Sequence, residues 1–221
     1  VTANLKVFAY ALPDVRDNRF HLDLWQNPYS VARWHNVRLW SDEHFEYLRP
    51  VMQMLADAGQ KVITATVLDK PWNGQTEDPF GPMITKIKRA DGSWLYDYTI
   101  FDKWVEFMMG LGIDEQINCY SMVPWKMSFD YFDQATNSLA SVECTVDSPE
   151  FANYWGSFLK DFQEAAAAVN PIEPVFVDYS KDMSKLSAKN GIEVLYKKNV
   201  TNGIFTLEYM FETGSYADKI L

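Results

Sequence analysis

Apolar positions along the chain follow two different spacings, and their order predicts alternating strands and helices. Residues 61–68 (KVITATVL) are almost all β-branched or apolar, which is typical of a parallel strand buried on both faces. A helix is predicted between Ser41, a favourable N-cap residue, and Gly59, because apolar residues recur there every three or four positions. The same criteria predict further strands over 1–10, 20–25 and 116–122, and further helices over 98–111 and from Ser148 onward.

Three segments depart from this alternation. A long loop is predicted over 69–97, and a loop of this length inside a compact domain usually has a function. Residues 126–145 are predicted to form a hairpin that turns near 134–137. A second hairpin is predicted over 191–211, with its turn at Asn202-Gly203.

The order strand, helix, strand, helix, strand, hairpin, helix predicts an α/β fold built from right-handed parallel β-α-β units. About three such units form half of a (β/α)8 barrel of the TIM type, or most of a small open sheet. Long loops after the strands are typical of the catalytic face of these barrels, so we expect a partial barrel. After Gln163 the pattern changes to a linker-like segment followed by the C-terminal β-hairpin.

Composition and charge exclude some classes of function. The chain has 221 residues, of which 48% are hydrophobic and 23% charged, as expected for one substantial domain with a packed core. The net charge of -10 would repel a nucleic acid, and no apolar run approaches the ~20 residues that span a bilayer. The chain starts at Val1 without a signal peptide, so we expect a processed or trimmed start. Cys119 and Cys144 either form one disulfide or remain unpaired thiols, and the second reading is favoured.

Candidate chemistry lies at the ends of the predicted strands, where side chains would point into the mouth of a barrel. Polar groups beneath aromatic rings are typical of a sugar subsite, and 15% of the residues are aromatic. The candidate substrate-binding residues are His21, Asp23, Trp25, Thr66, Trp72, Asn118, Tyr120 and Trp125.

Each candidate also has a purely structural interpretation. His21 could be a hydrogen-bonded core histidine, and Asp23 could accept from a neighbouring backbone amide. Trp25 could belong to the core. Trp72 and Trp125 lie in loops beside proline, which favours exposure.

Other chemistries find little support in the sequence. Glycoside hydrolysis generally needs two carboxyl groups, but the adjacent pairs Asp42-Glu43 and Asp114-Glu115 precede a helix and a strand, away from the expected mouth. No zinc-protease pattern, nucleophile elbow or glycine-rich phosphate loop is present, and no metal or cofactor is expected.

Several segments resemble one enzyme family. They are residues 20–28 (FHLDLWQNP), 58–64 (AGQKVIT), 71–76 (PWNGQT), 90–94 (ADGSW), 101–108 (FDKWVEFM), 116–125 (QINCYSMVPW) and 155–162 (WGSFLKDF). Together they resemble the first three barrel strands, with their helices, of glycoside hydrolase family 123, which includes β-N-acetylgalactosaminidases. The resemblance runs from about Val7 to Gln163, and it implies that residues 1–12 end a preceding β-sandwich while 13–163 form the front half of the barrel.

The resemblance implies a retaining, substrate-assisted mechanism on N-acetylhexosamine glycans, such as those containing N-acetylgalactosamine. In that family an adjacent Asp-Glu pair on the fourth strand orients the acetamido group and supplies the general acid. The next strand candidate here is 174–179 (PVFVDY), in which Tyr follows Asp178. The expected pair is therefore absent, and we expect a catalytically incomplete protein. The resemblance further implies a periplasmic or secreted location.

Residues 164–221 resemble a different family. Segments 175–179 and 191–211 are similar to a non-catalytic part of pitrilysin-type zinc peptidases, which suggests a junction of two coding sequences near Gln163. An open half barrel exposes sheet edges, so a homo-oligomer is expected. The main alternative to a glycosidase-derived chain is a non-catalytic carbohydrate-binding or protein-interaction module.

Overall fold

The computed structural model describes residues 3–11, 13–17, 20–169, 184–187 and 193–196. Its contacts divide the chain into two compact units, Val1–Phe162 and Gln163–Leu221. The first unit carries every candidate site residue, and it is the unit on which the functional argument depends.

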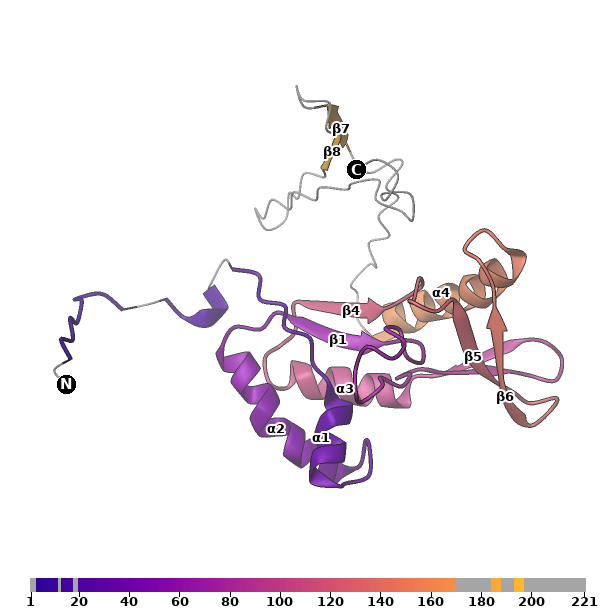
Figure 1. The fold of residues 1–221 in the computed structure, drawn as a ribbon, viewed down its shortest axis with the longest axis horizontal. Helices are drawn as coiled ribbons and strands as arrows, with labels where there is room; N and C mark the ends of the chain where they lie inside the picture. Colours follow the sequence, from indigo (N-terminus) through magenta and orange to yellow (C-terminus); the bar gives the residue numbers. More distant parts are fainter. Residues whose placement is uncertain (1–2, 12, 18–19, 170–183, 188–192, 197–221) are drawn as a thin grey trace. The chain divides into compact units, whose positions relative to one another are not determined.

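The described residues form a mixed α/β fold, which confirms the predicted class, and they form no closed barrel (Figure 1). The elements are a short 3-10 turn (Val15–Asp17), α1 (Pro28–His35), α2 (Asp42–Asp57), β1 (Val62–Thr66), β2 (Thr85–Lys88), β3 (Trp94–Asp97), α3 (Thr99–Met109), β4 (Gln116–Tyr120), β5 (Ser128–Asp133), β6 (Ser138–Glu143), α4 (Pro149–Val169), β7 (Ser184–Ser187) and β8 (Glu193–Tyr196). None of the helices described is long and apolar enough to cross a membrane.

The predicted strands over 61–68 and 116–122 are confirmed as β1 and β4, which pair in parallel. Their register sets Thr64 opposite Asn118 and Thr66 opposite Tyr120. α3 packs against β1, where the indole Nε1 of Trp104 donates to the carbonyl of Thr64 at 3.0 Å. The long apolar stripe predicted for this helix is thereby buried against the sheet.

The predicted strand over 20–25 is wrong as a regular strand, since its one β-bridge joins Leu22 to Gln60. The cause is the side chains of two buried glutamines, which replace the backbone pairing along this edge of β1. The Oε1 of Gln26 accepts from the backbone N–H of Thr64 at 2.7 Å, and the Oε1 of Gln60 accepts from that of Leu24 at 2.9 Å. Residues 22–26 therefore run alongside β1 on the edge opposite to β4.

The predicted loop over 69–97 is also wrong, because it contains the antiparallel pair of β2 and β3. Gly92 adopts a φ of 86° at the turn between them, a conformation that glycine reaches without strain. The hairpin predicted over 126–145 is confirmed as β5 and β6. β2 pairs in parallel with β5, and this joins both hairpins into one four-stranded sheet of order β3-β2-β5-β6.

Aromatic residues of α4 cover this four-stranded sheet. The Tyr154 hydroxyl donates to the carbonyl of Asp130 at 2.9 Å, and the rings of Phe129 and Trp155 meet edge to face at 5.7 Å. The helix begins where predicted, since the Ser148 hydroxyl accepts from the backbone N–H of Phe151 at 3.2 Å.

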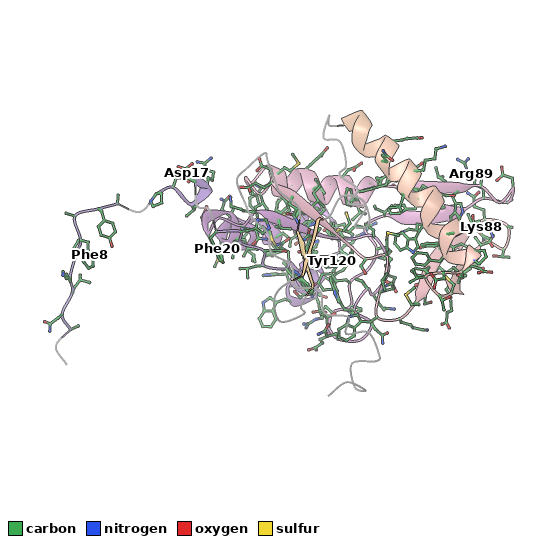
Figure 2. All side chains as sticks on the ribbon, turned by 90° about the horizontal axis from the view of Figure 1, so that it is seen from above. Phe8, Asp17, Phe20, Lys88, Arg89 and Tyr120 are labelled. Carbon is green, nitrogen blue, oxygen red and sulfur yellow. The ribbon has the colours of Figure 1, made fainter. Side chains whose placement is uncertain are left out.

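The remaining predictions have mixed outcomes. The strand predicted over 1–10 is wrong for its described residues, which form no strand and are exposed, as Phe8 is in Figure 2. Both cysteines are free, in agreement with the favoured reading. In the second unit, β8 pairs with β7, whereas the turn predicted at Asn202-Gly203 lies outside the described residues.

Candidate functional site

Three rings from separate segments meet at the carboxyl ends of the parallel elements. Trp25 stacks on Trp72, with ring centroids 4.9 Å apart and an angle of 27° between the planes. Tyr120 closes the group, at 5.1 Å from Trp25 and 4.9 Å from Trp72. We call these three residues the aromatic cluster. Tyr120, labelled in Figure 2, is the last residue of β4.

The local backbone explains why these rings converge. Gln26, which follows Trp25, is fixed to the edge of β1 by its side chain. Trp72 lies in a tight loop in which Lys70 and Asn73 have positive φ values of 48° and 53°. This loop is closed by the backbone N–H of Lys70, which donates to the carbonyl of Phe80 at 2.7 Å.

The cluster has a buried floor and an open surface. Trp72 is only 8% exposed, so the exposure predicted from its place in a loop is wrong, because its ring is covered by Trp25 and meets Phe80 edge to face at 4.8 Å. Trp25 rests on Trp72 yet remains 56% exposed. A large apolar ring that is supported on one side and open to solvent is suited to stacking against the C–H face of a sugar.

Polar groups lie beside the rings. The Asn118 side chain donates from Nδ2 to the Oδ2 of Asp23 at 3.0 Å, across the width of β1. The other carboxylate oxygen of Asp23 is buried and has no hydrogen-bond partner among the described residues. Burial raises the pKa of Tyr120, as does the nearby Asp23 carboxylate, although hydrogen bonds with Asn118 and Trp25 oppose this shift. Tyr120 therefore keeps its proton at neutral pH.

The structure brings together five of the candidates, namely Asp23, Trp25, Trp72, Asn118 and Tyr120. The side chains of the other three take no part in these contacts. His21 is exposed and has no hydrogen bond or ring contact within the described part of the chain. Thr66 is buried and donates to the carbonyl of Gly81 at 2.6 Å, which is a structural role. Trp125 is 67% exposed, and its backbone N–H donates to Pro71 at 3.0 Å without its ring joining the cluster.

Sequence reasoning missed the residues that support the site. Gln26 and Gln60 hold the Trp25 segment. Phe80 packs against Trp72, and Tyr29 packs against Phe80. The sequence held a signal for both glutamines, since Gln26 directly follows the predicted strand 20–25 and Gln60 directly precedes the predicted strand 61–68. Nothing in the local pattern indicated that Phe80 faces Trp72, because that contact depends on the fold of the intervening loop.

The adjacent acidic pairs lie elsewhere. Asp42 is the first residue of α2 and forms an ion pair with Lys103 at 2.8 Å. Glu115 precedes β4 and forms an ion pair with Lys61, at the opposite end of the strands from Tyr120. The part of the chain that the structure describes contains no group of three His, Cys, Asp or Glu side chains able to hold a metal ion.

A family model and a solved structure both relate this chain to the same protein family. The model of the glycoside hydrolase 123 catalytic domain matches residues 25–202, a range that runs through Gln163. One similar solved structure is a family 123 glycoside hydrolase from Clostridium perfringens, studied for glycolipid glycan hydrolysis. It is 32% identical with a TM-score of 0.68, and the match covers 71% of this chain and 28% of that one. This chain thus spans less than a third of that structure. The search of curated proteins found no match to this chain.

Proposed function

The chain belongs to glycoside hydrolase family 123, and on this premise we propose that its aromatic cluster binds one sugar unit of an N-acetylhexosamine-containing glycan. The observation that carries the proposal is Trp25, which lies open to solvent on the buried ring of Trp72. The Asp23–Asn118 pair beside it offers an acceptor and a donor for sugar hydroxyl or amide groups. Apolar ring faces combined with a few fixed polar groups are the usual composition of such a site.

We further propose that residues 22–26, β1 and β4 are the first three strands of a (β/α) barrel. Their parallel direction and their order along the chain support this assignment, as do the helices that follow each of them. On this reading the aromatic cluster lies at the carboxyl ends of the strands, where barrel enzymes place their sites. The two hairpins are then insertions in the loops after the second and third strands.

We propose that the chain binds glycans without hydrolysing them. The family resemblance implies an Asp-Glu pair on the next strand, whereas the pairs at Asp42 and Asp114 lie away from the aromatic cluster. Carbohydrate binding is therefore the first candidate function, and hydrolysis of the glycan is the second. A periplasmic or secreted location is part of the proposal, because such glycans lie outside the cytoplasm.

A fluorescence titration tests the binding proposal. Because the ring of Trp25 would contact the sugar while it rests on Trp72, an oligosaccharide ending in N-acetylgalactosamine should quench tryptophan emission in a saturable manner. Trp25→Ala should weaken this binding by about five- to tenfold, the size expected for a lost ring contact. Trp34→Ala is the matched control, since Trp34 is an exposed indole on α1 outside the cluster. Equal losses in both variants would contradict the site.

Turnover is tested separately. A chromogenic N-acetylgalactosaminide should remain intact on incubation with the chain, while the oligosaccharide still binds. Steady release of the chromophore would refute the proposed loss of catalysis and would place the chain among the active glycosidases.

A further inference from the structure

Lys86 is an unusual side chain of the hairpin β2–β3. It is only 3% exposed, and its Nζ donates to the backbone carbonyl of Val67. Three rings of α4 surround the amine, with centroids 4.6 Å away for Phe158, 5.6 Å for Tyr154 and 5.7 Å for Trp155. No carboxylate forms an ion pair with it within the described part of the chain.

An unpaired buried amine is costly, since the charged form loses its hydration. Burial lowers the pKa of Lys86 to about 7. An apolar side chain of similar length would fill the same space without this penalty. The titratable groups that face Lys86 from the packed elements are Asp69 after β1, Asp130 in β5, Tyr154 in α4 and Tyr96 opposite it in β3.

The Val67 carbonyl that accepts from Lys86 lies at the start of the loop that leads to Trp72. Val67 follows β1, and its N–H donates to the carbonyl of Tyr120 at 2.8 Å. The chain continues from Val67 through Leu68 and Asp69 to Trp72. Val67 is therefore fixed to Tyr120 through its N–H and to Lys86 through its carbonyl, just before the loop that carries the second ring of the aromatic cluster.

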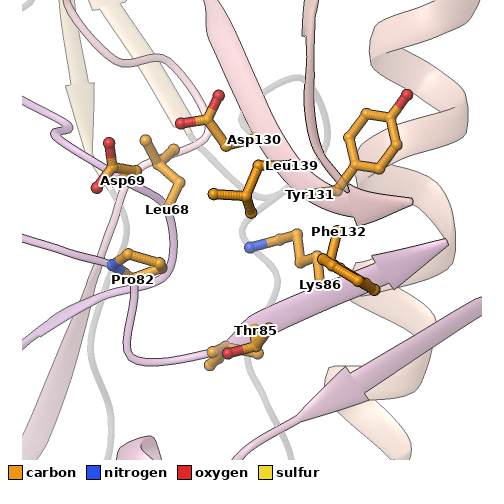
Figure 3. A pocket seen from close by; sticks show the side chains of 10 residues that line it. Leu68, Asp69, Pro82, Thr85, Lys86, Asp130, Tyr131, Phe132 and Leu139 are labelled. Atoms are coloured by element: carbon orange, nitrogen blue, oxygen red, sulfur yellow. The ribbon is translucent and has the colours of Figure 1, made fainter. Parts of the chain in front are cut away.

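A small pocket with about 70 Å³ of free volume borders this contact. Figure 3 shows the Lys86 side chain reaching into it toward Leu68 and Leu139, with Asp69 and Asp130 beyond them. The pocket borders Leu68 and Asp69 on the side of the loop that faces Lys86. On that side the hydrogen bond from Lys86 adds a polar anchor to the packing of the buried Val67 and Leu68 side chains.

We propose that Lys86 is a positioning residue, whose amine anchors the Val67 carbonyl to the aromatic face of α4 and so fixes the loop that presents Trp72 beneath Trp25. The effect of this positioning on ligand binding rests on the proposed glycan site. The structural part, that Lys86 controls the conformation of residues 67–72, stands independently of any ligand.

Substitution tests the consequence for binding. Lys86→Met keeps the length, removes the donor and also removes the cost of burying an amine, so the variant should still fold. Its affinity for the N-acetylgalactosamine oligosaccharide should fall by about fivefold, because the loop is no longer held. Lys88→Met, the same change on the same strand, should bind like the parent chain. Parent-like binding by a folded Lys86→Met would overturn the proposal.

NMR of the unaltered chain tests the structural part without a variant that must fold. The Lys86 side-chain carbons are followed between pH 6 and 9, together with the backbone amide of Leu68 and the indole N–H of Trp72. We expect the Leu68 and Trp72 signals to shift with the same midpoint as Lys86. If Lys86 titrates while both stay fixed, Lys86 does not position the loop. If they shift together but no sugar binds, only the proposed glycan function fails.

Discussion

Two regions of the first unit are built on different forces. The parallel framework, comprising residues 22–26, β1 and β4, is joined by backbone pairing and by the amide side chains of Gln26 and Gln60. The hairpin sheet, comprising β2, β3, β5 and β6, is joined to α4 by closely packed rings, such as Phe129 and Tyr154, whose centroids are 5.1 Å apart. Hydrogen bonds define direction in the first region, whereas apolar packing supplies rigidity in the second.

The difference assigns the two regions separate roles. The parallel framework carries the polar candidates Asp23 and Asn118, and it leaves a carboxylate oxygen of Asp23 unsatisfied among the described residues. The hairpin sheet carries none of the candidates, yet Lys86 of its strand β2 binds the loop that leads to Trp72. The site therefore depends on the parallel framework, which carries its polar groups, and on the hairpin sheet, which binds the loop that carries Trp72.

The largest expected effect comes from removing a ring of the rigid region. Trp155 is buried against Phe129 and Phe158, so Trp155→Ala should lower the free energy of unfolding by about 3–5 kcal/mol. Urea unfolding followed by circular dichroism measures this loss. Leu139→Ala is the control on the same sheet, because Leu139 is exposed and should change stability by less than about 0.5 kcal/mol. Comparable losses in both would show that the rings do not dominate this region.

The next effect is a pH dependence that originates in the same region. The pKa of Lys86 is lowered to about 7 from 10.5, so between these values the unfolded chain binds more protons than the folded one. Stability should then rise with pH, by at most about 1.4 kcal/mol per pH unit. Denaturant unfolding at pH 7, 8 and 9 measures the slope. Lys86→Met should remove it, and an unchanged slope in that variant would assign the dependence to other groups.

The two regions also differ in how much of their secondary structure could be predicted from the sequence. Residues 22–26 form one bridge where a regular strand was predicted. By contrast, β1, β4 and α2 followed from periodicity, because a buried strand such as 61–68 and a capped helix from Ser41 have local signatures. The hairpin β2–β3 did not, since its strands are only four residues long and rely on pairing with β5. Pairing between distant segments leaves no periodic trace in either segment.

The site was predicted to a similar extent. Asp23, Trp25, Asn118 and Tyr120 were expected from their places in or beside predicted strands, and they meet in the structure. Thr66 was expected in the mouth on the same logic but is buried against Gly81 instead, because the segment predicted as a long loop folds back over the strand end. Positions on a strand are therefore predictable from sequence, whereas what covers a strand end is not.

A smaller effect should follow from breaking the amide pairing of the parallel framework. Gln26→Ala leaves the backbone N–H of Thr64 buried without its acceptor, and the free energy of unfolding should fall by about 1–3 kcal/mol. Gln53→Ala is the control, because Gln53 bonds only to the exposed Asp57 on α2 within the described residues. Thermal unfolding of both variants makes the comparison. Equal stability of the two would mean that the edge of β1 is held by other contacts.

The smallest effect on stability, and the clearest one on assembly, is expected at the outer strand of the parallel framework. Ile117 of β4 is 41% exposed, and among the described strands β4 pairs only with β1. A strand that exposes an apolar side chain and has one edge unpaired among the described residues favours pairing with a second copy, so the chain should elute from a sizing column with a concentration-dependent dimer fraction. Ile117→Lys should change the free energy of unfolding by less than about 0.5 kcal/mol while shifting elution to the monomer, since a charge opposes pairing at that edge. The hairpin sheet offers the contrast: Leu139→Lys lies on β6, which is also an end strand among the described residues, so an unchanged dimer fraction in this variant would assign the pairing to β4. If Leu139→Lys abolishes dimerisation and Ile117→Lys does not, self-association belongs to the rigid region rather than to the framework of the site.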